Sequence, residues 1–213
     1  PCGLRRYYPN LLTREAAMSL EYVKWSNRVT AEHNVHLAFT RMLAGPMDYT
    51  PGGFFNVPAA SFAPRFLNPQ VPTTRAHQVA LYVVFESGFT MVADFPGAYK
   101  DQPETPFIAK VPVAWDETRV LSGDPDHYIV IARRKGREWY VGGITNADAR
   151  DLKVALDFLP EGGYSLTTIA DAASAATEPM KTTITKSTVT HATVLELKLA
   201  PAGGFTLHLT PAR

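Results

Sequence analysis

Two glutamates near the start of the chain raise the question of acid–base chemistry. Glu15 and Glu21 lie six residues apart in the stretch 7-YYPNLLTREAAMSLEYVKWS-26. Carboxyl groups are common general acids and bases, provided that they reach the reacting atoms. On an ideal α-helix, six residues correspond to a rotation of about 240°, so the two side chains would not share a face. Either they are ordinary surface charges, or the chain bends between them and brings both to one site.

The sequence around each glutamate allows a separate interpretation. Glu15 follows Thr13 and Arg14, and an acidic residue in a first helical turn there would be stabilised by the helix dipole without any further function. Glu21 lies among apolar and aromatic residues in 20-LEYVKW-25. Such neighbours should destabilise the charged carboxylate by desolvation and raise its pKa. A raised pKa is what a general acid needs near neutral pH.

Other reaction types have weaker support in the sequence. The G-x-S-x-G, G-x-G-x-x-G, P-loop and H-E-x-x-H signatures are absent, and no spacing supports a serine–histidine hydrolase. His33 and His36 are three residues apart, which does not match a zinc-binding helix, and we expect them in a loop and at the entry to a strand. We expect Arg133, Arg134 and Lys135 at the solvated end of a hairpin rather than in a phosphate site.

Composition and charge limit the class of protein. The 213 residues are 46% hydrophobic and 19% charged, as in an ordinary globular protein. A net charge of +1 gives no argument for a nucleic-acid partner, and no apolar run approaches the roughly 20 residues that span a bilayer. The single cysteine, Cys2, cannot form an internal disulfide. The chain opens without an initiator Met or a secretion signal, and we expect any such signal to lie upstream.

Residues 1–110 combine helical patterns with loops rich in proline and glycine. The stretch 74-TRAHQVALYVVFES-87 predicts a helix, capped by Thr73 or Thr74 and buried against something large. Before it, 38-AFTRMLAGPMDYTPGG-53 predicts a short buried strand that ends in a loop. A short strand, an irregular loop and a long helix are typical of a β/α protein.

Residues 111–213 have the pattern of an antiparallel sandwich. The runs 128-YIVIARR-134 and 138-EWYVGGIT-145 predict a hairpin, and further short strands are expected in 152-LKVALDFL-159, 164-YSLTTIAD-171 and 181–210. We place a domain boundary near Val111. Trp115, Trp139 and Tyr140 could stack on sugars if they are exposed, although packing in the core is the more ordinary role of such residues.

Long stretches of the chain resemble glycoside hydrolase family 97, a family of calcium-dependent α-glucosidases and α-galactosidases. The resemblance begins with 7-YYPNLLTREAAMSLEYVKWS-26 and 39-FTRMLAGPMDYTPG-52. It continues through 78-QVALYVVFES-87, 107-FIAKVPVAWDETRVL-121 and 129-IVIARRKGREWYVGGIT-145. Ala38, where the family usually has proline, and 87-SGFT-90 depart from the family pattern, but neither involves the glutamates.

The resemblance implies a fold class and roles for both glutamates. The fold class is α/β plus all-β. Residues 1–110 would be the C-terminal part of a catalytic (β/α)8 barrel, and residues 111–213 a C-terminal antiparallel β-sandwich domain. Glu21 falls on the family's general acid, which also contacts the calcium ion (Ca²⁺), and Glu15 falls on a second calcium-ligating glutamate. An α-linked oligosaccharide would be the substrate, and the protein would be periplasmic or secreted.

The same resemblance implies that the site is incomplete within this chain. Glycoside hydrolysis ordinarily needs two carboxyl groups, and the family's base or nucleophile lies upstream of the equivalent of Pro1. A few barrel strands cannot close on themselves, so we expect self-association, or a rearranged barrel remnant, if these 213 residues fold alone. The alternative is a non-catalytic fragment that acts as a structural or carbohydrate-binding module.

Overall fold

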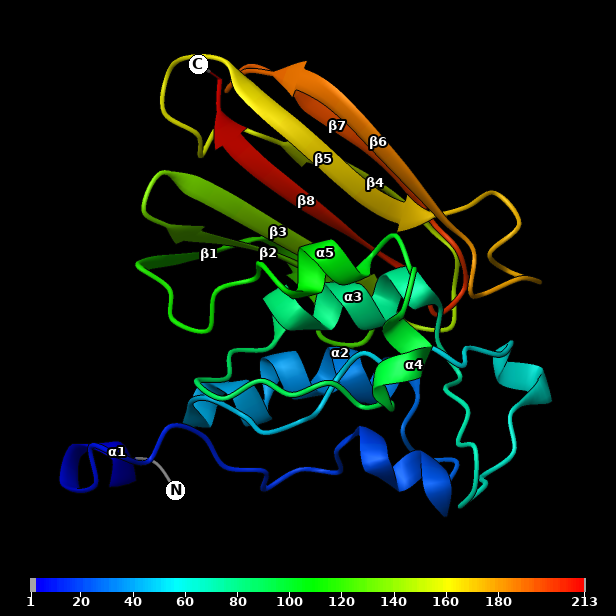
Figure 1. Cartoon of the computed structure of the whole chain (residues 1–213). Helices are drawn as coiled ribbons and strands as arrows, with labels where there is room; N and C mark the ends of the chain where they lie inside the picture. The colour runs from blue at the N-terminus through cyan, green and yellow to red at the C-terminus, as the bar shows by residue number, and fades with distance from the viewer. Residues whose placement is uncertain (1–2, 213) are drawn as a thin grey trace.

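The computed structural model describes residues 3–212 of the chain, so Cys2 lies outside the described residues. Figure 1 shows strands gathered on one side of the molecule, with helices and long loops on the other, while α1 (Leu4–Tyr7) lies apart from the main body. Among the helices of the described part, none is long and apolar enough to cross a membrane.

The β-strands form two antiparallel sheets. The strands of the described residues are β1 (Glu117–Asp124), β2 (Tyr128–Lys135), β3 (Glu138–Thr145), β4 (Arg150–Ala155), β5 (Tyr164–Asp171), β6 (Thr182–Val189), β7 (Val194–Leu199) and β8 (Gly204–Pro211). Six of them make one sheet in the order β1-β2-β3-β8-β5-β6, and β4 pairs with β7 in the other. The predicted antiparallel sandwich and the hairpin of β2 and β3 are therefore confirmed.

An apolar core fills the space between the two sheets. Trp139, Phe205 and Leu207 from the larger sheet pack with Val154 and Leu199 from the smaller one. Strands of the larger sheet carry apolar side chains on both faces, because helices cover the other face. The near-continuous apolar runs of β2 and β3 follow from this double burial.

The aromatic residues that could have bound sugars lie mainly in the core. Trp139 is 2% and Tyr140 3% exposed. Trp115 is half-buried and packs edge-on against the Tyr140 ring, with 5.5 Å between the ring centroids. Packing, rather than sugar stacking, explains why these three residues are aromatic.

Helix α3 (Arg75–Val84) occupies the layer against the larger sheet. Thr74 caps it by accepting a hydrogen bond from the main-chain N–H of His77, and all ten of its residues are buried. Glycines let the helix approach β3 and β8 closely. A Cβ atom at Gly142 would lie 2.9 Å from the carbonyl oxygen of Ala80, and one at Gly204 would lie 2.8 Å from the Cα atom of His77. The predicted buried helix is confirmed: the larger sheet covers one side of it, and stretches from the first 110 residues pack on the other.

The remaining helices are short. They are the 3₁₀ turns η1 (Leu20–Lys24), η2 (Arg41–Ala44) and η3 (Ala59–Ser61), and the helices α2 (Ala31–Phe39), α4 (Pro96–Tyr99) and α5 (Thr105–Ile108). The strand predicted from residue 38 onward is wrong: α2 and η2 occupy that stretch. Thr30 starts α2 by accepting the N–H of His33, and the helix buries Val35 and Ala38. The apolar run therefore belongs to a buried helix face.

A barrel is not formed by the described residues of this chain. Before Glu117 they contain helices, loops and two isolated parallel bridges, Arg14 with Met47 and Asn56 with Val71, but no strand. All strands of the described residues therefore belong to the antiparallel sandwich.

The prediction for Arg133 is wrong. This side chain is 3% exposed rather than solvated. Its Nε donates to the carbonyl oxygen of Val83 at 2.6 Å and one Nη donates to that of Val84 at 3.1 Å, so Arg133 caps the C-terminus of α3. Arg134 is half-buried and Lys135 exposed, as expected near the end of a hairpin.

Candidate functional site

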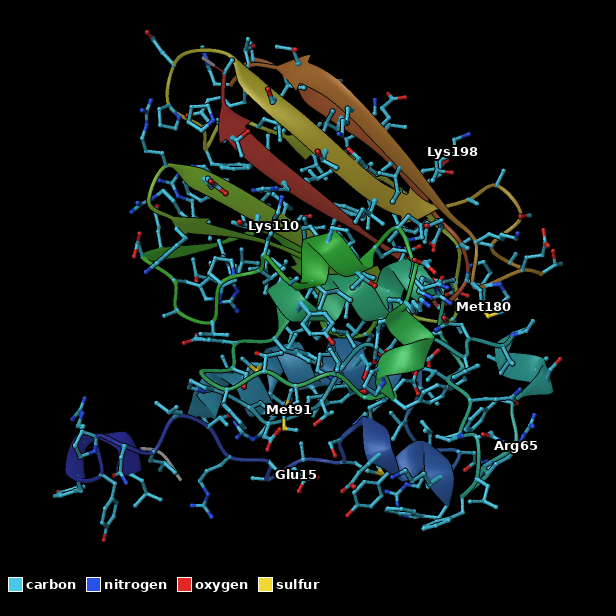
Figure 2. All side chains as sticks on the ribbon, viewed as in Figure 1. Glu15, Arg65, Met91, Lys110, Met180 and Lys198 are labelled. Atoms are coloured by element: carbon cyan, nitrogen blue, oxygen red, sulfur yellow. The ribbon has the colours of Figure 1, made fainter. Side chains whose placement is uncertain are left out.

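Glu15 and Glu21 line the same pocket. This pocket has a volume of about 300 Å³ and is bounded by four stretches of chain. Its walls are formed by Glu15, Ser19, Leu20, Glu21, Val23, Lys24, Asp48, Thr50, Gly53, Pro69, Val71, Ala93 and Asp94. The chain therefore does bend between the two glutamates and bring both to one site. Figure 2 shows Glu15 on the side of the molecule away from the β-sheets.

The bend follows from the local backbone. Glu15 lies in an extended segment directly after the parallel bridge of Arg14 with Met47. The next residue, Ala16, has a φ of 44°, a left-handed conformation that is uncommon for residues other than glycine. Glu15 is therefore not in a first helical turn, and the interpretation based on the helix dipole is wrong.

Arg41 fixes the segment that carries Glu15. Its guanidinium group donates to main-chain carbonyl oxygens of two adjacent stretches, those of Arg14, Glu15, Gly45 and Pro46, at 2.6 to 3.2 Å. Five N–H donors in a planar group suit such a task. Arg41 thus holds the backbone of Glu15 against the stretch that leads to Asp48.

Hydrogen bonding also orients the Glu15 carboxylate. The hydroxyl group of Ser19, a buried residue, donates to Oε1 of Glu15 at 2.7 Å. The Glu15 side chain itself is exposed. The second oxygen, Oε2, has no hydrogen-bond partner among the residues that the structure describes.

Glu21 lies in η1 and is exposed. The turn buries Leu20 and Val23 and directs Glu21 away from them. The expectation that its apolar sequence neighbours shield Glu21 from water is therefore wrong for this chain. In a 3₁₀ turn, neighbouring residues point in different directions.

Two further carboxyl groups line the pocket, and sequence reasoning missed both. Asp48 and Asp94 are half-buried and come from loops after α2 and α3. Burial raises the pKa of Asp94 above its ordinary value, against the opposing effects of a hydrogen bond from the Phe54 N–H and of the Arg75 charge. The only available signal was that each aspartate lies beside proline- or glycine-rich breakers, in 46-PMDYTPGG-53 and 94-DFPG-97.

The pocket offers oxygen ligands of the type that calcium prefers, but only part of a set. Calcium takes 6–8 oxygen atoms, often from carboxylates, and the four carboxyl groups around this pocket have that chemistry. No group of three or more His, Cys, Asp or Glu side chains within residues 3–212 is arranged to hold a metal ion. The donor chemistry fits calcium, and the remaining ligands would have to come from elsewhere.

The histidines of 32-EHNVH-36 do not contribute to this pocket. Both lie on α2, so the prediction of a loop and strand entry is wrong. Nε2 of His33 lies 2.7 Å from the carbonyl oxygen of Met18, and Nε2 of His36 lies 3.3 Å from Oδ1 of Asp126.

Comparisons with known proteins match almost the whole chain. The family model described as "Glycosyl-hydrolase 97 C-terminal, oligomerisation" matches residues 114–210. A retaining alpha-galactosidase of Bacteroides thetaiotaomicron is 42% identical over 212 residues, which are 98% of this chain and 32% of that protein. A probable retaining alpha-galactosidase of Streptomyces bingchenggensis is 35% identical over 160 residues, 73% of this chain and 22% of that protein.

A solved structure confirms the likeness in three dimensions. The structure of a glycoside hydrolase family 97 enzyme from Pseudoalteromonas sp. strain K8, in complex with acarbose, matches with a TM-score of 0.89 at 41% identity. The match covers 99% of this chain and 33% of that one, so the chain spans about a third of the length of such relatives. The chain belongs to glycoside hydrolase family 97, and its residues 114–210 are the C-terminal domain of that family.

Proposed function

We propose that this chain contributes the general acid, Glu21, and two calcium-binding carboxylates, those of Glu15 and Glu21, to the active site of an α-glycoside hydrolase. The observation that carries the proposal is that both glutamates line one pocket although six residues separate them. The substrate class is α-linked galactosides or glucosides. The two curated relatives, which are named as alpha-galactosidases, favour galactosides.

The described residues suggest how each group would act. Glu21, exposed at the pocket, would give its proton to the leaving glycosidic oxygen. Ser19 would orient Glu15 by donating to Oε1, which leaves Oε2 for a cation. Calcium bound there would contribute positive charge that favours the ionised carboxylates around the reacting bond.

The second catalytic carboxylate would come from outside this chain. A retaining mechanism needs a nucleophilic carboxylate about 5–5.5 Å from the acid, and the relatives named above are called retaining enzymes. We therefore propose a retaining reaction whose nucleophile is supplied by a part of the enzyme that this chain does not include.

The proposal assigns residues 1–110 to the end of the catalytic barrel and residues 111–213 to the sandwich domain. Barrel strands are parallel, and catalytic residues come from their C-terminal ends. Arg14 forms a parallel bridge with Met47 immediately before Glu15. A short parallel bridge of this kind is expected where the C-terminal end of a barrel strand lies without the rest of the barrel.

The experiment uses the complete polypeptide in which this sequence is encoded. Glu21→Gln should lower kcat by about 10²–10⁴-fold on methyl α-galactoside, because an alkyl leaving group needs the proton. The loss should be smaller on p-nitrophenyl α-galactoside, which has a better leaving group. Glu178→Gln, at an exposed residue of the sandwich, is the matched control. Equal losses on the two substrates would refute the role of Glu21 as the acid.

The proposed roles of Glu15 and Glu21 as calcium ligands are tested by removing Ca²⁺ and adding it back. A chelator should abolish turnover, and added Ca²⁺ should restore it. Glu15→Gln should raise the Ca²⁺ concentration needed for half-maximal recovery. Activity that is indifferent to chelation would refute the proposed ligand roles.

We further propose that the 213-residue chain self-associates when it is produced alone. Several large apolar side chains of the first 110 residues are exposed, among them Leu12, Trp25, Leu43, Phe66, Leu67 and Phe89, and exposed apolar patches mark contact surfaces. The family description also names oligomerisation for the C-terminal domain. Light scattering should give a mass above that of one chain. A monomer that does not bind an apolar dye would contradict this proposal.

A periplasmic or secreted location is also proposed, on the resemblance alone. Cell fractionation of the organism that makes the protein is the measurement, and recovery of the protein only from the cytosol would overturn it.

A further inference from the structure

Asp94 is the more extensively hydrogen-bonded of the two aspartates that line the pocket. Its Oδ2 accepts the main-chain N–H of Phe54 at 2.6 Å. Its own main-chain N–H lies 2.8 Å from the hydroxyl oxygen of Tyr99, and that hydroxyl donates to the carbonyl oxygen of Gly52 at 2.9 Å. Tyr99 is buried. These three hydrogen bonds tie the loop before α4 to the 52–54 stretch, so the carboxylate cannot easily turn away from the pocket.

One oxygen of this carboxylate remains without a donor. Within the described part of the chain, Oδ1 of Asp94 has no hydrogen-bond partner. The carboxylate of Asp48 makes no hydrogen bond within the described residues. Unlike the carboxylate of Asp94, it is therefore not held in one orientation by the protein. A half-buried carboxylate has lost part of its hydration, and hydrogen bonds from a ligand would compensate for the loss.

The pocket of about 300 Å³ gives a ligand room beside Asp94, and its wall at Gly53 is tightly packed. Gly53 lines the pocket, and a Cβ atom there would lie 2.4 Å from Cγ2 of Val71, another pocket residue. On the same wall, Thr50 has a φ of 57°. Backbone strain of this kind persists where the surrounding structure enforces it, often at a ligand site. A side chain at position 53 would collide with Val71, so this part of the pocket wall depends on glycine.

We propose that Oδ1 of Asp94 accepts hydrogen bonds from hydroxyl groups of the substrate's sugar ring, so that Asp94 binds and orients the sugar beside Glu21. This inference rests on the proposed function, because it takes the pocket to be the sugar-binding site. A carboxylate that accepts from neutral hydroxyl groups forms short, strong hydrogen bonds, and it selects a sugar by the positions of those hydroxyl groups.

The experiment compares Asp94→Asn with Asp101→Asn in the complete encoded polypeptide. The asparagine at position 94 keeps an acceptor for the Phe54 N–H but removes the charge that would face the sugar. Asp101 is exposed, and its φ of 59° is tolerated by asparagine, so the second variant is a matched control. Circular dichroism and thermal unfolding establish that both variants fold.

Isothermal titration with galactose and with glucose is the direct readout, at saturating Ca²⁺. Asp94→Asn should weaken binding of the preferred sugar, and raise KM for its p-nitrophenyl α-glycoside, by about 10–100-fold. Asp101→Asn should change neither. The inference is overturned if Asp94→Asn binds the sugar as the unmodified protein does, if the unmodified protein binds neither sugar, or if extra Ca²⁺ restores binding to the variant.

The outcome for Glu21 separates this inference from the proposed function. If Glu21→Gln abolishes turnover while Asp94→Asn binds sugar normally, the proposed function stands and the role of Asp94 is wrong. If the polypeptide binds sugar through Asp94 but hydrolyses no α-glycoside, the sugar-binding role stands and the proposed reaction is wrong.

Discussion

Nδ1 of His77, on α3, lies 3.1 Å from the carbonyl oxygen of Gly203, in the turn that leads into β8. The other ring nitrogen, Nε2, lies 3.0 Å from the amide nitrogen of Asn34 on α2. Oδ1 of Asn34 in turn accepts the hydroxyl hydrogen of Tyr49 at 2.5 Å. This arrangement requires a neutral imidazole with the proton on Nδ1, because Nε2 must accept from Asn34. The buried chain of hydrogen bonds joins the stretch near the candidate site to the sandwich.

We predict that His77 makes the fold sensitive to acid. Burial lowers the pKa of His77 to about 4, against 6.5 for an ordinary histidine. Between pH 6.5 and 4 the unfolded chain binds a proton that the folded chain does not, so stability is present above pH 6.5 and is lost as the pH falls. The expected loss is about 3 kcal/mol. Urea unfolding at pH 7 and pH 4 measures it, and His77→Gln should remove this part of the pH dependence.

Asp171 should act in the opposite direction. Burial raises the pKa of its carboxyl group to about 6, although the N–H groups of Ala200 and Gly204 donate to Oδ2 and oppose the shift. The folded chain holds this proton more tightly, so the contribution to stability is full below pH 3.8 and is lost as the pH rises through 6. Asp171→Asn removes this contribution. The increase in the free energy of unfolding between pH 4 and pH 7 should therefore be larger in the variant by about 3 kcal/mol. An unchanged pH profile would contradict the assignment.

Gly142 should not tolerate even one methyl group. Gly142→Ala would place a Cβ atom 2.9 Å from the carbonyl oxygen of Ala80 and 2.9 Å from Cβ of Val83, so α3 would be pushed off the sheet. We expect a loss of about 1–3 kcal/mol in the free energy of unfolding. Gly163→Ala is the control, because the nearest atom to its Cβ, Cβ of Ala212, lies at an ordinary 3.5 Å. Equal effects of the two substitutions would refute the close approach of α3.

Two adjacent arginines should differ in their contribution to stability. Arg133→Met would leave the buried carbonyl groups of Val83 and Val84 without their donor, with an expected cost of about 2–4 kcal/mol. Arg134→Met would remove half-exposed ion pairs with Asp116 and Glu117, with an expected cost below about 1 kcal/mol. Urea unfolding of both variants at neutral pH is the measurement. Similar costs would show that Arg133 does not support α3.

Ser19→Ala tests whether the orientation of Glu15 matters for the proposed metal site. The substitution removes the hydrogen bond to Oε1 of Glu15 but keeps both carboxylates. Because such supporting contacts typically contribute 10–100-fold in metal affinity, we expect weaker binding of Ca²⁺ to the complete polypeptide by about that factor. Ser26→Ala is the control: the Ser26 hydroxyl group accepts a hydrogen bond from the main-chain N–H of the exposed Arg28, and its loss should leave Ca²⁺ binding unchanged. Calcium titration calorimetry distinguishes the two variants.

The elements that could be predicted from the sequence are those stabilised by local interactions. The cap and apolar pattern of 74-TRAHQVALYVV-84 specify α3, because the cap and the repeat lie within one short segment. The turn at Gly136, which has a φ of 57°, joins the hairpin of β2 and β3. In contrast, the apolar run from residue 38 predicts a strand where the structure has α2 and η2, because a short apolar run does not distinguish a strand from a buried helix.

The sequence identifies two of the four carboxyl groups that line the candidate site. Glu15 and Glu21 stand in a distinctive stretch, and the resemblance to family 97 identified them. Asp48 and Asp94 reach the same pocket from loops far along the chain, and nothing in their local sequence indicates that convergence.

Residues that are close in the chain were sufficient to predict α3, the hairpin of β2 and β3 and, through the resemblance, the family and the two glutamates, because each of these is encoded in a short stretch. Only the folded chain shows that β8 inserts between β3 and β5, that Arg133 is buried at the C-terminal end of α3, and that Asp94 lines the same pocket as Glu21. Each of these depends on contacts between residues dozens of positions apart, and the free energy of such contacts is set by the packing of the whole chain rather than by any local pattern.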